Sequence, residues 1–174
     1  MMTGRLDQLP EFVNCILIDR MNNDKQSHLP HVHEKELELF YVHAGTGQYM
    51  VDNRLYPIRE GDIVICNAGV LHGEEPSLVR QIHSYSVAMT GVQMEGLPPN
   101  CLIDYKTNPV VSCGQLSVHV GQLMQLLYLL SADTAHLGNV CGSLAYSMLL
   151  LTQALLNSRA RNEAIDEMEQ PSVL

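Results

Sequence analysis

Short segments rich in β-branched and aromatic residues follow one another closely through the first half of this chain. Turns bearing glycine or Asp52-Asn53 separate them, and the segments cover residues 12–19, 37–42, 48–51, 55–58, 63–66 and 79–89. Strands this short and this evenly spaced leave no room for the crossover helices of a parallel sheet. The pattern therefore predicts an antiparallel β-sandwich or small barrel over residues 12–89.

The apolar period becomes helical from residue 115 onward. One stripe steps by four and three residues, the spacing of a helix-packing seam, and comprises Leu116, Val120, Leu123, Leu127 and Leu130. A break at residues 131–139, which contains Gly138-Asn139, precedes a second apolar helix expected at about 140–159. The two helices form an antiparallel hairpin that either covers the sheet or makes a dimer contact.

The charge and composition of the chain limit the kinds of partner that it is expected to bind. The formal net charge is −9, and the 10 Lys and Arg residues form no basic cluster, so this chain by itself is not expected to bind DNA. Five cysteines without C-x-x-C spacing indicate reduced thiols. The sequence shows no signal peptide and no unbroken apolar stretch of membrane-spanning length, which predicts a cytoplasmic protein without membrane contact.

Four potential metal ligands lie within residues 31–72. His31 and His33 are two residues apart and share one side of a strand. A turn or bulge at Glu34-Lys35 would bring Glu38 to the same side, and His72 arrives from a turn after the next strands. Three imidazoles and a carboxylate suit Zn, Fe, Mn, Ni, Co or Cu. Such a set can also leave a coordination position open.

The spacing of these residues resembles the two motifs of the cupin superfamily. The first motif is filled by His31-Val32-His33, four residues, Glu38, six residues and Gly45. The second is filled by Gly61, five residues, Asn67-Ala68-Gly69, two residues and His72. Asn67 replaces its proline, Pro76 its final asparagine, and Lys25 the glycine expected before the first histidine. The resemblance implies a mainly β, antiparallel cupin (jelly-roll) barrel followed by a two-helix antiparallel hairpin.

The wider pattern is similar to the N-terminal effector-binding and dimerisation domain of AraC-type transcription regulators. This resemblance covers about residues 12–160 and includes Tyr56-Pro57-Ile58-Arg59-Glu60-Gly61-Asp62. It implies an arm and barrel at 1–105, a dimerising helical hairpin at 106–160 and a tail or linker at 161–174. Those regulators bind DNA through helix-turn-helix units, which this chain does not contain.

Two functions follow from these resemblances. One is a sensor that binds a small molecule in the barrel, forms a homodimer and controls a DNA-binding region. Its effector pocket is expected to be lined by Phe40, Val42, Met50 and Tyr85. The alternative is a stand-alone metal-dependent cupin enzyme of the dioxygenase or isomerase type. The complete ligand set favours the enzyme, because a regulator needs no metal.

Overall fold

Eight antiparallel strands and two helices make up the computed structural model, which describes residues 9–18, 29–74 and 80–169. The strands are β1 (Glu11–Ile18), β2 (His31–Val32), β3 (Leu37–Val51), β4 (Arg54–Arg59), β5 (Asp62–Cys66), β6 (Leu71–Glu74), β7 (Arg80–Thr90) and β8 (Val110–Ser112). The 3₁₀ turn η1 (Gly114–Leu116) leads into helix α1 (Ser117–Leu130). A second turn, η2 (Ser131–Asp133), leads into helix α2 (Thr134–Glu169). The predicted arm before residue 9, the loop at 21–27, the end of the tail from residue 170, Lys25 and Pro76 lie outside the described residues.

The long strand β3 joins the two parts of the barrel. Its first half pairs with β7 and β5, and its second half pairs with β4 and β6. Irregular register between Val42 and Thr46 marks the change of partners, so the segments predicted separately at 37–42 and 48–51 form one strand. Asp52 and Asn53 both have positive φ, as a two-residue hairpin turn into β4 requires. The predicted antiparallel barrel is confirmed.

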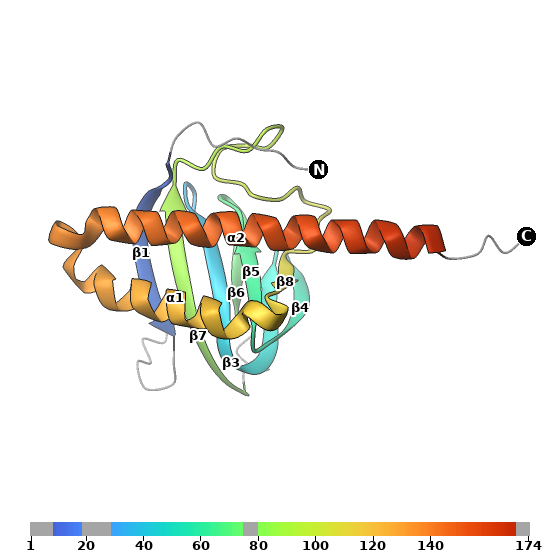
Figure 1. Ribbon diagram of the computed structural model, residues 1–174, viewed down its shortest axis with the longest axis horizontal. Helices are drawn as coiled ribbons and strands as arrows, with labels where there is room; N and C mark the ends of the chain where they lie inside the picture. Colours follow the sequence, from blue (N-terminus) through green and yellow to red (C-terminus); the bar gives the residue numbers. More distant parts are fainter. Residues whose placement is uncertain (1–8, 19–28, 75–79, 170–174) are drawn as a thin grey trace, which may run out of the picture.

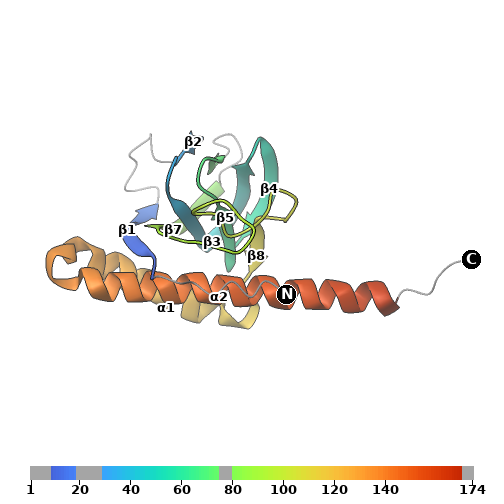
Figure 2. The ribbon, with the colours of Figure 1, turned by 90° about the horizontal axis from the view of Figure 1, so that it is seen from above.

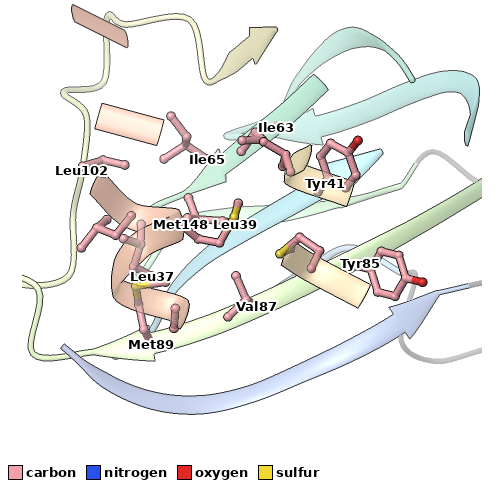
Figure 3. Close-up of a cluster of buried hydrophobic side chains, with 14 of the residues drawn as sticks. Leu37, Leu39, Tyr41, Ile63, Ile65, Tyr85, Val87, Met89, Leu102 and Met148 are labelled. Carbon is pink, nitrogen blue, oxygen red and sulfur yellow. The ribbon is translucent and has the colours of Figure 1, made fainter. Parts of the chain in front are cut away.

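Alternation along β3 separates two layers of core. Leu37, Leu39 and Tyr41 point toward the helices, where they pack with Met124, Met148 and other buried residues (Figure 3). Phe40 and Val42 point to the barrel interior, together with Tyr49, Ile58 and Val64. All five cysteines are buried and free.

The two helices run antiparallel along one side of the sheet, and α2 continues past the barrel (Figures 1 and 2). The predicted break at 131–139 is wrong, because only η2 separates the helices and Gly138-Asn139 lies inside α2. Helix α2 also continues to Glu169, since residues 160–169 contain mostly good helix formers and neither glycine nor proline. Strand β8 pairs with β5, so the sheet extends to residue 112.

The segment 114–165 is long and apolar enough, by length and composition, to cross a membrane. Part of its apolar content packs on the sheet, where Val120, Met124, Leu127, Met148 and Leu149 are buried. The core helices of folded domains pass the same compositional test.

Replacement of Met148 by alanine is expected to lower the free energy of unfolding by about 2–5 kcal/mol, because the side chain is fully buried between α2 and the sheet. Ile165→Ala is the matched control, since Ile165 is 53% exposed on the same helix. The control should change stability by no more than about 0.5 kcal/mol. Urea unfolding followed by circular dichroism measures both, and equal effects would contradict the packing of α2 on the barrel.

Candidate metal centre

Strands β2 and β6 bring two histidines side by side. His31 pairs directly with His72, and the rings lie 4.7 Å apart between centroids. This approach depends on Gly73, whose φ is +158°. A Cβ atom there would lie 2.8 Å from the Cα of Pro30 and 2.9 Å from its nitrogen. Glycine is therefore needed for the chain before His31 to lie against β6.

A bend at residues 34–35 returns the chain to the barrel, and Glu38 on β3 then points inward beside the histidines. The structure thus brings together the four predicted ligands, whose ligand atoms all lie within 4.8 Å of one another. The Nε2 atoms of His31 and His33 are 3.1 Å apart, and His33 Nε2 is 3.2 Å from Glu38 Oε2. His72 Nε2 is 3.8 Å from Glu38 Oε1.

The outer nitrogen of each imidazole contacts an acceptor, which orients the ring. His31 Nδ1 donates to the carbonyl oxygen of Leu29, and His72 Nδ1 to that of Val70, both at 2.8 Å. A carbonyl can only accept, so Nδ1 holds the proton and Nε2 presents its lone pair to the cluster. His33 Nδ1 lies 3.3 Å from a carboxylate oxygen of Glu36. Metal-binding histidines are commonly held in this way by groups on the opposite ring nitrogen.

The inward nitrogen of His72 is the observation that best tests whether a metal fits. His72 is 0% exposed, and its Nε2 has no hydrogen-bond partner among the described residues. A buried polar atom without a partner is costly, and a metal ion would satisfy its lone pair. The donor set, three imidazoles and one carboxylate, is also one that transition metals accept. These residues fit a metal ion.

The charges within the cluster support the same interpretation. Burial alone would raise the pKa of Glu38, but the hydrogen bond from His33, with smaller contributions from the neighbouring His72 and Ser86, lowers this pKa to about 2. The hydrogen bond to Glu38 in turn raises the pKa of His33. Glu38 is therefore an anion at neutral pH and needs a positive charge beside it. A proton on His33 supplies that charge, and a metal would have to displace it.

A cavity of about 240 Å³ opens beside the ligands inside the barrel. Its walls include Phe40 and Tyr49, whose ring centroids are 4.5 Å apart, and Ile16, Ile18 and Asn14 of β1. Glu74, only 5% exposed, also lines it. This volume suits a small effector or substrate and is below the usual size of drug-like ligand pockets.

The other three residues that were predicted to line the effector pocket are Val42, Met50 and Tyr85, and they lie at different places in the fold. Val42 is buried in the interior cluster. Met50 is half-buried on the opposite face of β3, because the irregular register at 42–46 turns Tyr49 and Val51 inward instead. Tyr85 belongs to the core beneath the helices, where its ring lies 5.9 Å from that of Tyr128. The structure does not bring Met50 and Tyr85 to the cavity.

Glu36, Glu74 and Asn14 are polar residues of the site that were not predicted from the sequence. Glu36 supports His33 from three residues away, a short-range spacing that could have been noticed. Glu74 is two residues beyond His72 on the same strand, so strand alternation pointed to its face. Asn14 reaches the cavity from β1, and nothing in its local sequence indicates this.

Glu74 provides a prediction for pH dependence. Burial raises the pKa of Glu74 to about 7 from 4.5. A carboxyl group whose pKa is raised by folding contributes stability that is present below its unfolded pKa and lost as the pH rises through its folded pKa. Between pH 5 and 8.5, the metal-free protein should lose up to about 3 kcal/mol of stability that Glu74→Gln retains. Urea unfolding in the presence of chelator measures this, and parallel pH profiles would contradict it.

The predicted dimerisation residues are divided between the core and the surface. Val120 and Leu127 are buried against the sheet, and Leu123 and Leu130 pack partly on the same core. Leu116 is 40% exposed. The outward side of the helices presents a second set of apolar residues, namely Val118, Leu126, Leu129, Val140 and Leu150.

The fold and site define a cupin-type barrel that has a complete set of metal-ligand residues and helices on one side. Comparison with known proteins agrees: the family model described as the AraC-like ligand binding domain matches residues 18–151, and the chain belongs to this family. The uncharacterized HTH-type transcriptional regulator YdiP of Escherichia coli is 26% identical over 135 residues, 76% of this chain. The match covers 45% of YdiP, so the chain spans about half the length of that relative.

Solved structures match over part of the chain. A predicted oxalate decarboxylase from Thermotoga maritima is 18% identical, with 51% of this chain and 98% of that chain covered and a TM-score of 0.33. The plu4264 protein from Photorhabdus luminescens is 14% identical, with 51% and 85% covered and a TM-score of 0.33.

Proposed function

We propose that this chain is the ligand-sensing and dimerisation domain of an AraC-type transcription regulator. The observation that supports this most is the cavity beside the converging ligand atoms, in a chain of a ligand-binding family. The relative YdiP is an HTH-type regulator more than twice as long as the matched segment. DNA contact would then belong to a helix-turn-helix region outside this domain, in a cytoplasmic protein of net charge −9.

One divalent transition metal, drawn from Zn, Fe, Mn, Ni, Co and Cu, is proposed to bind His31, His33, Glu38 and His72. When bound, it would supply a Lewis-acid centre to which donor atoms of an effector could attach. Phe40 and Tyr49 would contact the effector's apolar part, and Asn14 and Glu74 its polar groups. An effector that binds one arrangement of the domain more tightly than another would shift the population toward it.

The helices within residues 106–160 are proposed to form a homodimer through their outward side. Val118 is 66% exposed and Leu129 62% exposed, and both lie on α1. Burial of such exposed apolar side chains against a second copy of the chain would stabilise a dimer. Residues 1–105, with β8, would form the sensing unit, and the end of α2 would lead toward the DNA-binding region.

Leu129→Glu is expected to convert the dimer to a monomer, because a charge on this outward side cannot be buried without a partner. Leu55→Glu is the control, since Leu55 is 48% exposed on β4, away from the helices. Size-exclusion chromatography with light scattering should show a monomer only for Leu129→Glu. A monomeric wild-type protein at high micromolar concentration would contradict the dimer.

The enzyme alternative, which the complete ligand set already favours, has a further observation in its support. Glu74 is a carboxyl group beside the ligand cluster with its pKa raised to about 7 by burial, as a general acid or base would need. Titration of metal-loaded protein with candidate small molecules distinguishes the two functions. A regulator releases each molecule unchanged and responds with altered dimer stability, whereas an enzyme converts it, and product formation should then disappear in Glu74→Gln.

A further inference from the structure

A second cavity, of about 620 Å³, lies outside the barrel interior and shares no lining residue with the first. One wall is the turn and start of β4, at Asp52, Arg54 and Tyr56. The opposite wall is the crossover segment at residues 96–109, which connects β7 to β8. At this size it can take a whole small organic molecule.

The surface of this cavity is largely apolar and aromatic. Val51, Ile65 and Ile103 are buried beneath it, and Leu97 and Val70 are half-buried at its sides. Tyr56 is half-buried, whereas Tyr105 is 79% exposed. An aromatic ring so exposed at the rim of an apolar cavity has one face free to stack on a flat ligand.

Side-chain hydrogen bonds fix the walls in place. The Asn67 side chain donates to the carbonyl oxygen of Ile103 at 2.7 Å and accepts from the nitrogen of Leu102 at 2.9 Å. The Asn100 side chain donates to the carbonyl oxygen of Lys35 at 2.7 Å and accepts from the nitrogen of Val92 at 2.9 Å. The crossover segment is thus held to the barrel on both sides, and the cavity is formed before any ligand enters. A preformed site avoids the entropy cost of ordering a loop.

The charges around the rim argue against an anionic ligand. Glu34, Asp52 and Asp104 line the cavity, against one basic group, Arg54. The ammonium of Lys106 lies 5.4 Å from the centre of the Tyr105 ring. The carboxylates outnumber the basic groups even with Lys106 included. A cation over the Tyr105 ring is also the arrangement that aromatic faces favour.

We propose that this cavity is an accessory binding site for a flat aromatic small molecule that is uncharged or positively charged. The ring system would lie against Tyr105 and Tyr56, above the apolar floor, and its cationic group would face the rim carboxylates. The site is separate from the metal-ligand cluster and does not depend on a metal.

Tryptamine and indole-3-acetate test this directly, because they share one ring system and carry opposite charges. Each is titrated into the ¹⁵N-labelled chain in the presence of chelator, and backbone amide shifts are followed. Tryptamine should shift the amides of Tyr56, Asn67 and Tyr105 saturably and leave those of Ile16 and Glu38 in place. Indole-3-acetate should bind at least about 5-fold more weakly, the equivalent of about 1 kcal/mol.

Tyr105→Ala should weaken tryptamine binding by at least about 5-fold, through loss of one stacking partner. The ring is exposed, so the variant should fold, which its unperturbed amide spectrum away from the cavity will show. Leu55→Ala is the control, because Leu55 precedes Tyr56 on β4 and does not line the cavity. This variant should bind tryptamine as the wild type does. The proposal is overturned by an absence of saturable shifts, by shifts confined to the barrel cavity, by equal losses in both variants, or by equal binding of the anion.

Discussion

Replacement of His72 by alanine is expected to reduce the affinity for Zn²⁺ by more than about 100-fold, since loss of an outer supporting group alone costs 10–100-fold at typical sites. His72 is fully buried, and the carbonyl oxygen of Val70 fixes its ring so that Nε2 faces Glu38. No other described histidine replaces it at the cluster. A competition titration against a chromophoric chelator measures the change.

His136→Ala is the matched control for this loss. His136 is an exposed histidine on α2 whose Nδ1 contacts Asp133 at 2.9 Å, far along the chain from the cluster. The control should retain wild-type affinity for Zn²⁺. If both variants bind Zn²⁺ as the wild type does, the four residues are not the metal site.

Gly73→Ala is expected to have the second large effect, on stability and metal binding together. The added Cβ would lie 2.8 Å from the Pro30 backbone, and alanine rarely adopts the φ of +158°. Either strain remains or β2 moves away from β6, which should cost about 2–4 kcal/mol of unfolding free energy. Movement of β2 also withdraws His31 from His72, so Zn²⁺ affinity should fall by at least about 10-fold.

Gly142→Ala is the control for Gly73→Ala, because it tests whether replacing any glycine by alanine destabilises the protein. Gly142 lies within α2, and a Cβ there would meet nothing within 4 Å. Alanine should therefore stabilise the helix by up to about 1 kcal/mol. Thermal unfolding and Zn²⁺ titration of both variants provide the measurement. A Gly73→Ala protein with unchanged stability would show that the close approach of β2 to β6 is not required.

The parts of the fold that follow from local periodicity could be predicted from the sequence. Alternation along β3 places Leu37, Leu39 and Tyr41 on one face and Glu38 on the other, as the pattern indicated. The motif spacing likewise predicts that His31, His33, Glu38 and His72 lie together, and their potential ligand atoms are within 4.8 Å of one another. These features depend on neighbours in sequence, where strand geometry is regular.

The predictions that differ from the structure concern places where strand or helix geometry is irregular, or where distant segments meet. One irregular stretch in β3 reverses the faces downstream, which moves Met50 out of the interior and brings Tyr49 in. Gly138 did not end the helix, because the packing of α2 outweighs the small helix cost of one glycine. Asn14 joins the cavity only through the pairing of β1 with β7, a contact between segments about seventy residues apart.

The structure also explains one position at which this sequence departs from the cupin motif. Asn67 occupies the position where the motif has proline, and its side chain fastens the turn before His72 to residues 102 and 103. Proline would restrict the same turn through its ring. The asparagine achieves a comparable restriction by hydrogen bonds to the crossover segment, which no local sequence pattern reveals.

We propose that His31, His33, Glu38 and His72 hold one transition metal ion within this ligand-binding domain. Elemental analysis of the protein, purified without added metal and then loaded separately with each candidate ion, tests it most directly. We expect about one equivalent of a single transition metal per chain for the wild type. Less than a tenth of an equivalent of every ion in the wild type, under all loading conditions, would contradict it.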